Sequence, residues 1–170
     1  MRKTIATLFL MFAICSVVPF SAVVQGASGT PTAVQGSIKL ELIEHATSIT
    51  NIDQGETGPS AGDLIVWGPN ALFDETNSSN TGATTQGVCT SLDATGQCLL
   101  LESIIFADGS TIQLQGLQAA GSGDSFRTIV GGSGIYLGAT GTVAVEPTDD
   151  LSMWVKTFEI WLSPRVSSAA

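Results

Sequence analysis

Short apolar stretches that alternate with polar positions recur along the chain, with glycine, aspartate, asparagine or serine between them. No stretch repeats apolar residues at helical spacing, so the pattern predicts an all-β chain. The expected strands are 37–49, 63–67, 84–90, 98–106, 111–116, 126–130, 142–145 and 153–162. Eight antiparallel strands that close into a β-barrel leave no exposed sheet edge, so this is the expected architecture. The longest polar connections, 53–62 and 70–82, are expected to be surface loops.

Acidic residues interrupt the apolar face of two of these strands. Glu44 follows Leu40 and Leu42 in the same phase, and Glu102 follows Leu100 in the same way. A carboxylate inside a barrel is costly unless it is protonated or partnered, and such groups are enriched at functional sites. A β-bulge that turns both acids toward water is the alternative, and the sequence leaves it open.

The segment 126–145 contains five glycines between short apolar stretches: Gly131, Gly132, Gly134, Gly138 and Gly141. A phosphate-binding loop needs a helix amino terminus and a cation, and neither pattern follows here. Glycines that permit tight turns and close strand approach instead predict a strand, a turn and a second strand.

The amino-terminal residues have the layout of a secretory signal peptide, with Arg2 and Lys3 before an apolar stretch and small residues near Gly26. We therefore expect a signal peptide over 1–26, a flexible spacer over 27–36, one barrel domain over 37–164 and a tail over 165–170. The mature protein is expected to be secreted or periplasmic, with no membrane segment after cleavage.

Charge and composition limit the kinds of partner and site that the protein can have. The formal net charge of −9 disfavours binding to nucleic acid and anionic lipid. A single histidine and the absence of a calcium-type spacing of carboxylates predict no metal site and no catalytic triad. Cys89 and Cys98 flank turn residues, and an oxidising destination favours a disulfide between them across a hairpin.

Several motifs occur in the same order as in the allene oxide cyclase family, over about 62–162. They are GDLIVWGPNALFD, GATTQGVC, SIIFADGSTIQLQG and the glycine array GGSGIYLGATGTV. The resemblance implies a lipocalin-shaped barrel whose apolar cavity folds an unstable fatty-acid epoxide for ring closure without a cofactor. Dirigent proteins, which the chain resembles less closely, share this barrel, are secreted and direct the coupling of reactive phenolic intermediates.

The resemblance also implies roles for individual residues. Glu44 and Asn70 match catalytic positions, where a carboxylate stabilises developing positive charge and an amide orients water or an oxygen. The residues expected to line the cavity or bind the ligand are Cys89, Glu102, Trp67, Phe106 and Tyr136. A bridged sulfur offers no thiol, so the predicted disulfide conflicts with a reactive role for Cys89.

Two functions that use the cavity follow as hypotheses, beside a third in which the barrel is filled by its own side chains and acts through its surface in adhesion or assembly. The first is a cofactor-free cyclase or isomerase, or a dirigent-like stereodirecting protein, that binds an apolar reactive intermediate. The second is a secreted, lipocalin-like carrier of a small apolar ligand without catalysis, which is favoured because Ala46 replaces a water-holding asparagine of the cyclase family. The expected partner is a small apolar molecule in both cases. Whether the chain catalyses a reaction, and whether it forms a homo-oligomer, stay open at this point.

Overall fold

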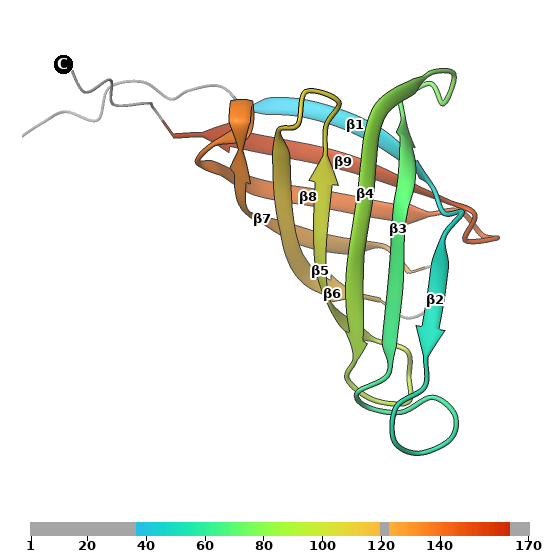
Figure 1. Cartoon of the computed structure of the whole chain (residues 1–170). Coiled ribbons are helices and arrows are strands. Elements are labelled where there is room, and N and C mark those ends of the chain that lie inside the picture. The colour runs from blue at the N-terminus through green and yellow to red at the C-terminus, as the bar shows by residue number, and fades with distance from the viewer. Residues whose placement is uncertain (1–36, 120–122, 164–170) are drawn as a thin grey trace, which may run out of the picture. The chain divides into compact units, whose positions relative to one another are not determined.

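The computed structural model describes residues 37–119 and 123–163, which form nine strands and one short 3₁₀ helix (Figure 1). The expected signal peptide, spacer and tail lie outside the described residues, and so does the last residue of the expected barrel domain 37–164. The elements are β1 (Ile38–His45), β2 (Ile49–Ile52), β3 (Leu64–Phe73), β4 (Asn80–Ser91), β5 (Cys98–Ile105), β6 (Thr111–Gln118), β7 (Ser125–Ser133), η1 (Gly134–Tyr136), β8 (Ala139–Pro147) and β9 (Met153–Leu162).

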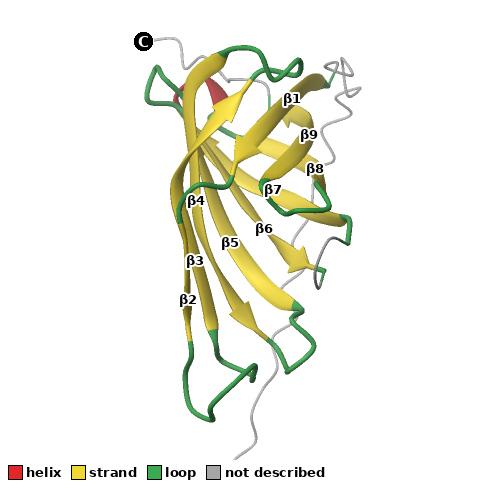
Figure 2. Cartoon of the chain, turned by 90° about the vertical axis from the view of Figure 1, so that its right-hand side faces the viewer, coloured by secondary structure: helices red, strands yellow, loops and turns green. Residues whose placement is uncertain are grey.

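The strands form one antiparallel sheet that closes on itself (Figures 1 and 2). From β2 to β9 each strand pairs with the next along the chain, and β1 pairs with β9 on one side and with the end of β3 on the other. Because β2 pairs with the beginning of the same β3, β1 and β2 together occupy one strand position. The predicted eight-stranded antiparallel barrel is therefore confirmed.

Two expected boundaries are corrected. The expected strand 37–49 is divided into β1 and β2, because the chain between them turns and its amides bond elsewhere: the Ala46 amide donates to the Ser152 carbonyl at 2.9 Å. The segment 70–82 is not a surface loop throughout, because β3 continues to Phe73 and β4 begins at Asn80. Asn70 and Leu72, at the start of that segment, are fully buried.

A β-bulge in β3 explains the buried Asn70. Trp67 pairs with Gly87, but Asn70 pairs with Thr85, so β3 advances by one residue more than β4. One extra residue exchanges the two faces of a strand. Trp67 and Asn70, which strict alternation would place on opposite faces, consequently both point into the barrel.

Gly68 makes this bulge sterically possible. Its φ of +93° lies in the left-handed region, where side chains are strained. A Cβ at this position would also collide with the backbone carbonyl of Thr85 and with Gln86 on β4. The glycine therefore allows both the backbone conformation and the close approach of the two strands.

The interior of the barrel has three zones, which can be read along β5. Its inward residues are Cys98, Leu100, Glu102 and Ile104, each at most 2 % exposed. One zone is an apolar core, made by Leu42, Leu72, Ala83, Ile104, Ile112, Leu114, Ile129, Ala139, Val143, Val145, Phe158 and Ile160. A second apolar cluster joins Cys89, Cys98 and Leu100 to Ile65 and Trp67. Between them lies a polar zone, made by Glu44, Asn70, Thr85, Glu102, Arg127 and Lys156.

Replacing Gly68 with alanine should destabilise the barrel by about 1 to 3 kcal/mol from the backbone conformation alone, and by more once the collision with β4 is added. Gly109→Ala is the matched control, because Gly109 also has a positive φ (+81°) but a Cβ there would meet nothing within 4 Å. Urea unfolding of both variants measures the difference. An equal loss in the two variants would contradict the role given to the contact between β3 and β4.

Candidate functional site

Glu102 lies at the centre of the polar zone and binds two cations. Its Oε1 is 2.6 Å from Lys156 Nζ, and its Oε2 forms an ion pair with Arg127 Nη1. The Thr85 hydroxyl also donates to Oε1, at 2.6 Å. All four side chains are at most 4 % exposed, so the cluster is held almost entirely out of water.

Glu44 is the second carboxylate of the cluster, and it shares Lys156 with Glu102. Lys156 Nζ is 2.9 Å from Glu44 Oε2, and Asn70 Nδ2 donates to Glu44 Oε1 at 2.7 Å. The Asn70 side-chain oxygen accepts a hydrogen bond from the Ser48 amide at 2.8 Å. Asn70 thus links the carboxylate to the backbone that joins β1 and β2.

The cluster is electrically balanced, since it has two carboxylates and two cations. Burial alone would raise the pKa of Glu102, but the charges of Lys156 and Arg127 outweigh it and hold this pKa well below its usual range. Glu102 is therefore ionised at neutral pH. It anchors the two cations and is not available as a proton donor there.

A cavity with an empty volume of about 480 Å³, its open mouth included, adjoins the cluster. Its walls are mainly apolar and include Ile49, Ile65, Trp67, Leu100 and Trp154 together with both cysteines. Its polar lining consists of Glu44, Gln118, Arg127 and Lys156. We call these four residues the polar floor; Glu44, Arg127 and Lys156 belong to the buried ion cluster, and Gln118 accepts a hydrogen bond from Arg127.

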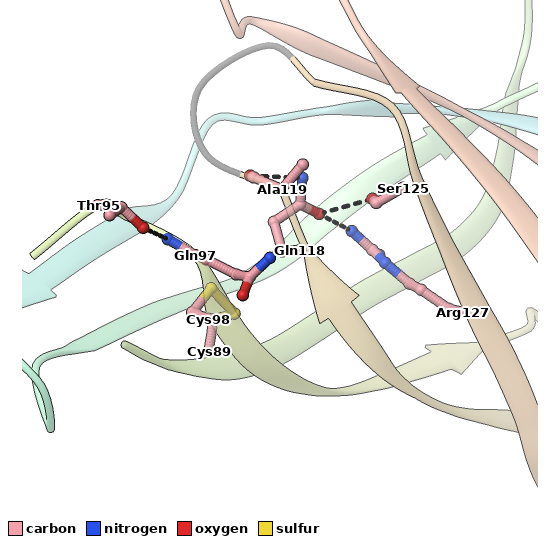
Figure 3. Close-up of a disulfide and its surroundings, with 8 residues drawn as sticks. All are labelled: Cys89, Thr95, Gln97, Cys98, Gln118, Ala119, Ser125 and Arg127. Carbon is pink, nitrogen blue, oxygen red and sulfur yellow. Dashed lines mark hydrogen bonds between the residues drawn. A yellow bond between two sulfur atoms is a disulfide. The ribbon is translucent and has the colours of Figure 1, made fainter. Parts of the chain in front are cut away.

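The predicted disulfide between Cys89 and Cys98 is confirmed, and the bonded pair forms part of the cavity wall. The two residues lie on the neighbouring strands β4 and β5, with their Cα atoms 5.5 Å apart. Figure 3 shows the disulfide together with Gln118, whose side-chain oxygen accepts hydrogen bonds from Ser125 and Arg127. Cys89 contributes apolar surface and no reactive thiol.

The structure brings some of the expected site residues together and separates others. Glu44 and Trp67 line the cavity, while Asn70 and Glu102 lie behind its lining and hold the ion cluster in place. Phe106 and Tyr136, expected at the cavity, lie elsewhere: their rings pack against each other at 4.6 Å and against the apolar core. This corrects the expected lining: Phe106 continues the inward phase of β5 beyond Ile104, on the side of the apolar core and away from Cys98 and Leu100, which line the cavity, and Tyr136 of η1 packs beside it.

Arg127 and Lys156 are functional candidates that the sequence reasoning missed. Both carry the same signal that identified the two glutamates, a charge placed in the phase of buried apolar residues. Arg127 precedes Ile129 by two positions, and Lys156 stands in the same way before Phe158. Lysine and arginine are rare in this chain, with six residues in all. Two of them in the inward phase of a strand therefore indicate buried, partnered cations.

Two further properties concern only the part of the chain that the structure describes. No three His, Cys, Asp or Glu side chains come close enough there to hold a metal ion. No helix within those residues is long and apolar enough to cross a membrane.

Comparison with known proteins shows the fold. No protein-family model matches the sequence, and no curated protein matches it. Among solved structures, the Diels-Alderase AbmU from Streptomyces koyangensis is similar with a TM-score of 0.64 and 21 % identity, over 82 % of this chain and 75 % of that one. A pyocyanin demethylase has a TM-score of 0.63 and 16 % identity, over 73 % and 100 %. The pterocarpan synthase dirigent protein GePTS1 has a TM-score of 0.58 and 16 % identity, over 78 % and 91 %.

These similarities bear out the resemblance to dirigent and cyclase-type barrels at the level of the fold. The chain has the β-barrel architecture of a dirigent protein and of a Diels-Alderase. At such identities the shared architecture does not carry an activity from one protein to another.

Replacing Glu102 with glutamine should destabilise the protein by roughly 3 to 5 kcal/mol, because in this buried site Arg127 would lose its carboxylate partner and Lys156 would keep only Glu44. Glu146→Gln is the matched control, since Glu146 is an exposed glutamate of β8. Chemical unfolding at pH 7 measures both changes. A loss no larger than that of the control would contradict the central role of Glu102.

The wild type and the Glu102→Gln variant also allow a test against pH. A carboxylate whose pKa is lower in the folded state adds stability above its unfolded pKa, near 4.5, and loses it as the pH falls toward the folded value. The difference in stability between the wild type and Glu102→Gln should therefore be largest above about pH 5 and shrink as the pH falls below it. A difference that grew on acidification would contradict the lowered pKa.

Proposed function

We propose that the barrel binds a small, largely apolar molecule in its cavity and acts on it as a cofactor-free cyclase or stereodirecting protein. The observation that carries this proposal is a cavity with apolar walls that adjoins a fixed layer of buried charges. Cavities with apolar walls and a few placed polar groups are typical of small-molecule sites.

The geometry suits chemistry that depends on shape and fixed charge. The walls, which include Trp67 and Trp154, would hold a flexible molecule in one folded conformation and so favour one ring closure over others. The floor presents Glu44 to developing positive charge and Arg127 to developing negative charge, in positions already fixed by the ion cluster. In this proposal Glu44 is the catalytic residue, and Asn70 is a positioning residue that acts through it.

The structural neighbours support a reaction of this kind. One is a Diels-Alderase and another is a dirigent protein that is a pterocarpan synthase. The pyocyanin demethylase has the same fold, so the barrel also accommodates other chemistry. The proposal therefore depends on the cavity and its floor, and the neighbours add support only.

A specific observation favours the alternative of a carrier without turnover. Each carboxylate oxygen of Glu44 and Glu102 already has a cation, amide or hydroxyl partner. The cluster therefore contains no unpaired carboxylate that could act as a general base. A reaction at this site would have to proceed by conformational control and charge stabilisation, and a site with neither effect would only bind its ligand.

We also propose that the protein is exported and that its signal peptide is removed. The Cys89–Cys98 disulfide fits an oxidising compartment, and the third cysteine, Cys15, lies within the expected leader. Exported protein should begin close to Ala27 and contain no free thiol. Amino-terminal sequencing and thiol titration under denaturing, non-reducing conditions measure these properties. A chain that begins at Met1 with one thiol would show that the leader is retained.

Replacing Glu44 with glutamine separates the two functions, because it removes the charge and nearly preserves the shape. For a cyclase, turnover should fall by roughly 10²- to 10³-fold, while ligand affinity changes little. For a carrier, affinity should be similar in both forms and neither should give product. The measurement is the rate and stereochemistry of product formation on a panel of epoxide, phenoxy-radical and polyene substrates, with ligand affinity measured in parallel.

Glu146→Gln serves again as the control, since it removes a carboxylate from the outer face of β8. Equal turnover by the wild type and Glu44→Gln would remove Glu44 from the mechanism. Binding without turnover on the whole panel would favour the carrier.

A further inference from the structure

The outer face of the sheet from β3 to β7 carries no charged side chain. These strands lie side by side (Figure 2), and the charged residues within them are Glu102 and Arg127, which both point into the barrel and are buried. The outer faces of β1 and β8, by contrast, include Lys39, Glu41 and Glu146. We call the outer side of β3 to β7 the uncharged face.

Large apolar side chains on the uncharged face are exposed to solvent. Val66 and Leu101 flank Val88 in one row across β3, β4 and β5. Leu99 and Leu117 form part of the next row, on β5 and β6. A broad apolar patch of this kind marks an interaction surface. The large apolar residues of the face that are at least 38 % exposed are Val66, Leu99, Leu101, Leu117, Phe126 and Val130.

The uncharged face has a groove and, next to it, a projecting side chain. The lining of the groove includes Val66, Val88, Leu101 and Val130. Phe126, near the start of β7, is 73 % exposed and lies outside that lining. Two copies of the face related by a two-fold axis can therefore each place this ring toward the groove of the other.

The size of the uncharged face suits a stable interface. Strands lie about 4.8 Å apart and rise about 3.3 Å per residue, so five strands with roughly eight residues in register make a face of about 600 Å². The relief of the side chains adds to this area. A standard interface buries about 800 Å² on each partner, which is comparable.

The charge of the chain favours a second copy that presents the same face. With a formal net charge of −9, two copies repel each other wherever their carboxylates approach. Glu41 and Glu146 on the other outer faces would be costly to desolvate against an apolar surface. A two-fold pair covers the uncharged face of both copies at once, whereas a head-to-tail contact would leave one of them open.

We propose that two copies of the chain pack through the uncharged face about a two-fold axis, with Leu101 of the central strand β5 close to the axis. This interface goes beyond the proposed function and would stand if the cavity bound nothing. It lies directly behind the cavity wall, because Leu99 and Leu101 alternate along β5 with Cys98 and Leu100.

Sedimentation velocity of the exported protein tests the proposal. The wild type should be a dimer at about 10 µM, since interfaces of standard size bind with micromolar or higher affinity. Dimer formation should strengthen when the salt concentration is raised from about 0.05 to 0.5 M, because salt screens the repulsion between two chains of like charge.

Leu101→Glu should weaken dimer formation by at least about 100-fold, because two like charges would meet at the centre of the interface. Leu101→Lys should do the same, and an equal mixture of the two variants should recover the dimer. Leu137→Glu is the matched control, since Leu137 is 62 % exposed but follows η1, outside the uncharged face. It should leave the wild-type dimer unchanged.

Hydroxyl-radical labelling of the wild type provides a second measurement that needs no variant. Raising the protein concentration should protect Leu101 and Phe126 from labelling and leave Leu137 unprotected. This result decides the question if the Leu101 variants do not fold, which circular dichroism would show.

Several results would overturn the proposal. A wild type that stays monomeric would mean that a second copy does not cover the face, and a trimer would exclude two-fold packing. A dimer that Leu101→Glu weakens no more than the control does would have its interface elsewhere. Failure of the mixed variants to recover the dimer would place Leu101 away from the axis and contradict the arrangement proposed.

Discussion

Lys156 bridges two buried carboxylates, and the ion cluster built on this bridge lies at the boundary between the apolar core and the cavity. The lysine of β9 connects Glu44 of β1 with Glu102 of β5, and Arg127 of β7 completes the charge balance. These strands lie at different positions around the closed sheet, so the cluster ties its walls together across the interior. Such a cluster is costly to desolvate, and apolar residues of similar volume would often be as stable. The cluster matters because of where it lies, since it marks where the apolar core ends and the cavity begins.

The floor of the cavity also depends on two local irregularities of the sheet. The bulge at Gly68 turns Asn70 inward, and the break between β1 and β2 presents the Ser48 amide to the same side chain. Asn70 can therefore hold Glu44 from one side while Lys156 holds it from the other. A regular β3 would place Asn70 outside the barrel, and Glu44 would lose its neutral partner. The irregular backbone thus contributes directly to the fixed orientation of the carboxylate.

Strand alternation predicted the strands and placed both glutamates in the phase of the apolar residues, because it depends on neighbouring residues only. The alternative of a bulge that turns them toward water stayed open until the structure showed both glutamates buried. The partners of Glu102 could not be predicted in the same way, since Arg127 and Lys156 are 25 and 54 residues away and meet it only through the closed sheet. Alternation alone did not place Asn70 inside the barrel, because the bulge at Gly68 reverses the phase of β3. Phe106 and Tyr136 were misplaced because an inward phase does not say whether a residue lies at the apolar core or at the cavity.

The similar barrels of a Diels-Alderase, a dirigent protein and a pyocyanin demethylase indicate which part of this protein carries its specificity. A closed sheet with an apolar core at one end can be kept by many sequences, which is consistent with identities of 16 to 21 % among similar folds. The donors and acceptors at the cavity floor are set by a few inward positions, and a change there alters recognition without altering the sheet. In this chain those positions hold Glu44, Gln118, Arg127 and Lys156. The residues of the polar floor therefore say more about the ligand than the similarity of the fold does.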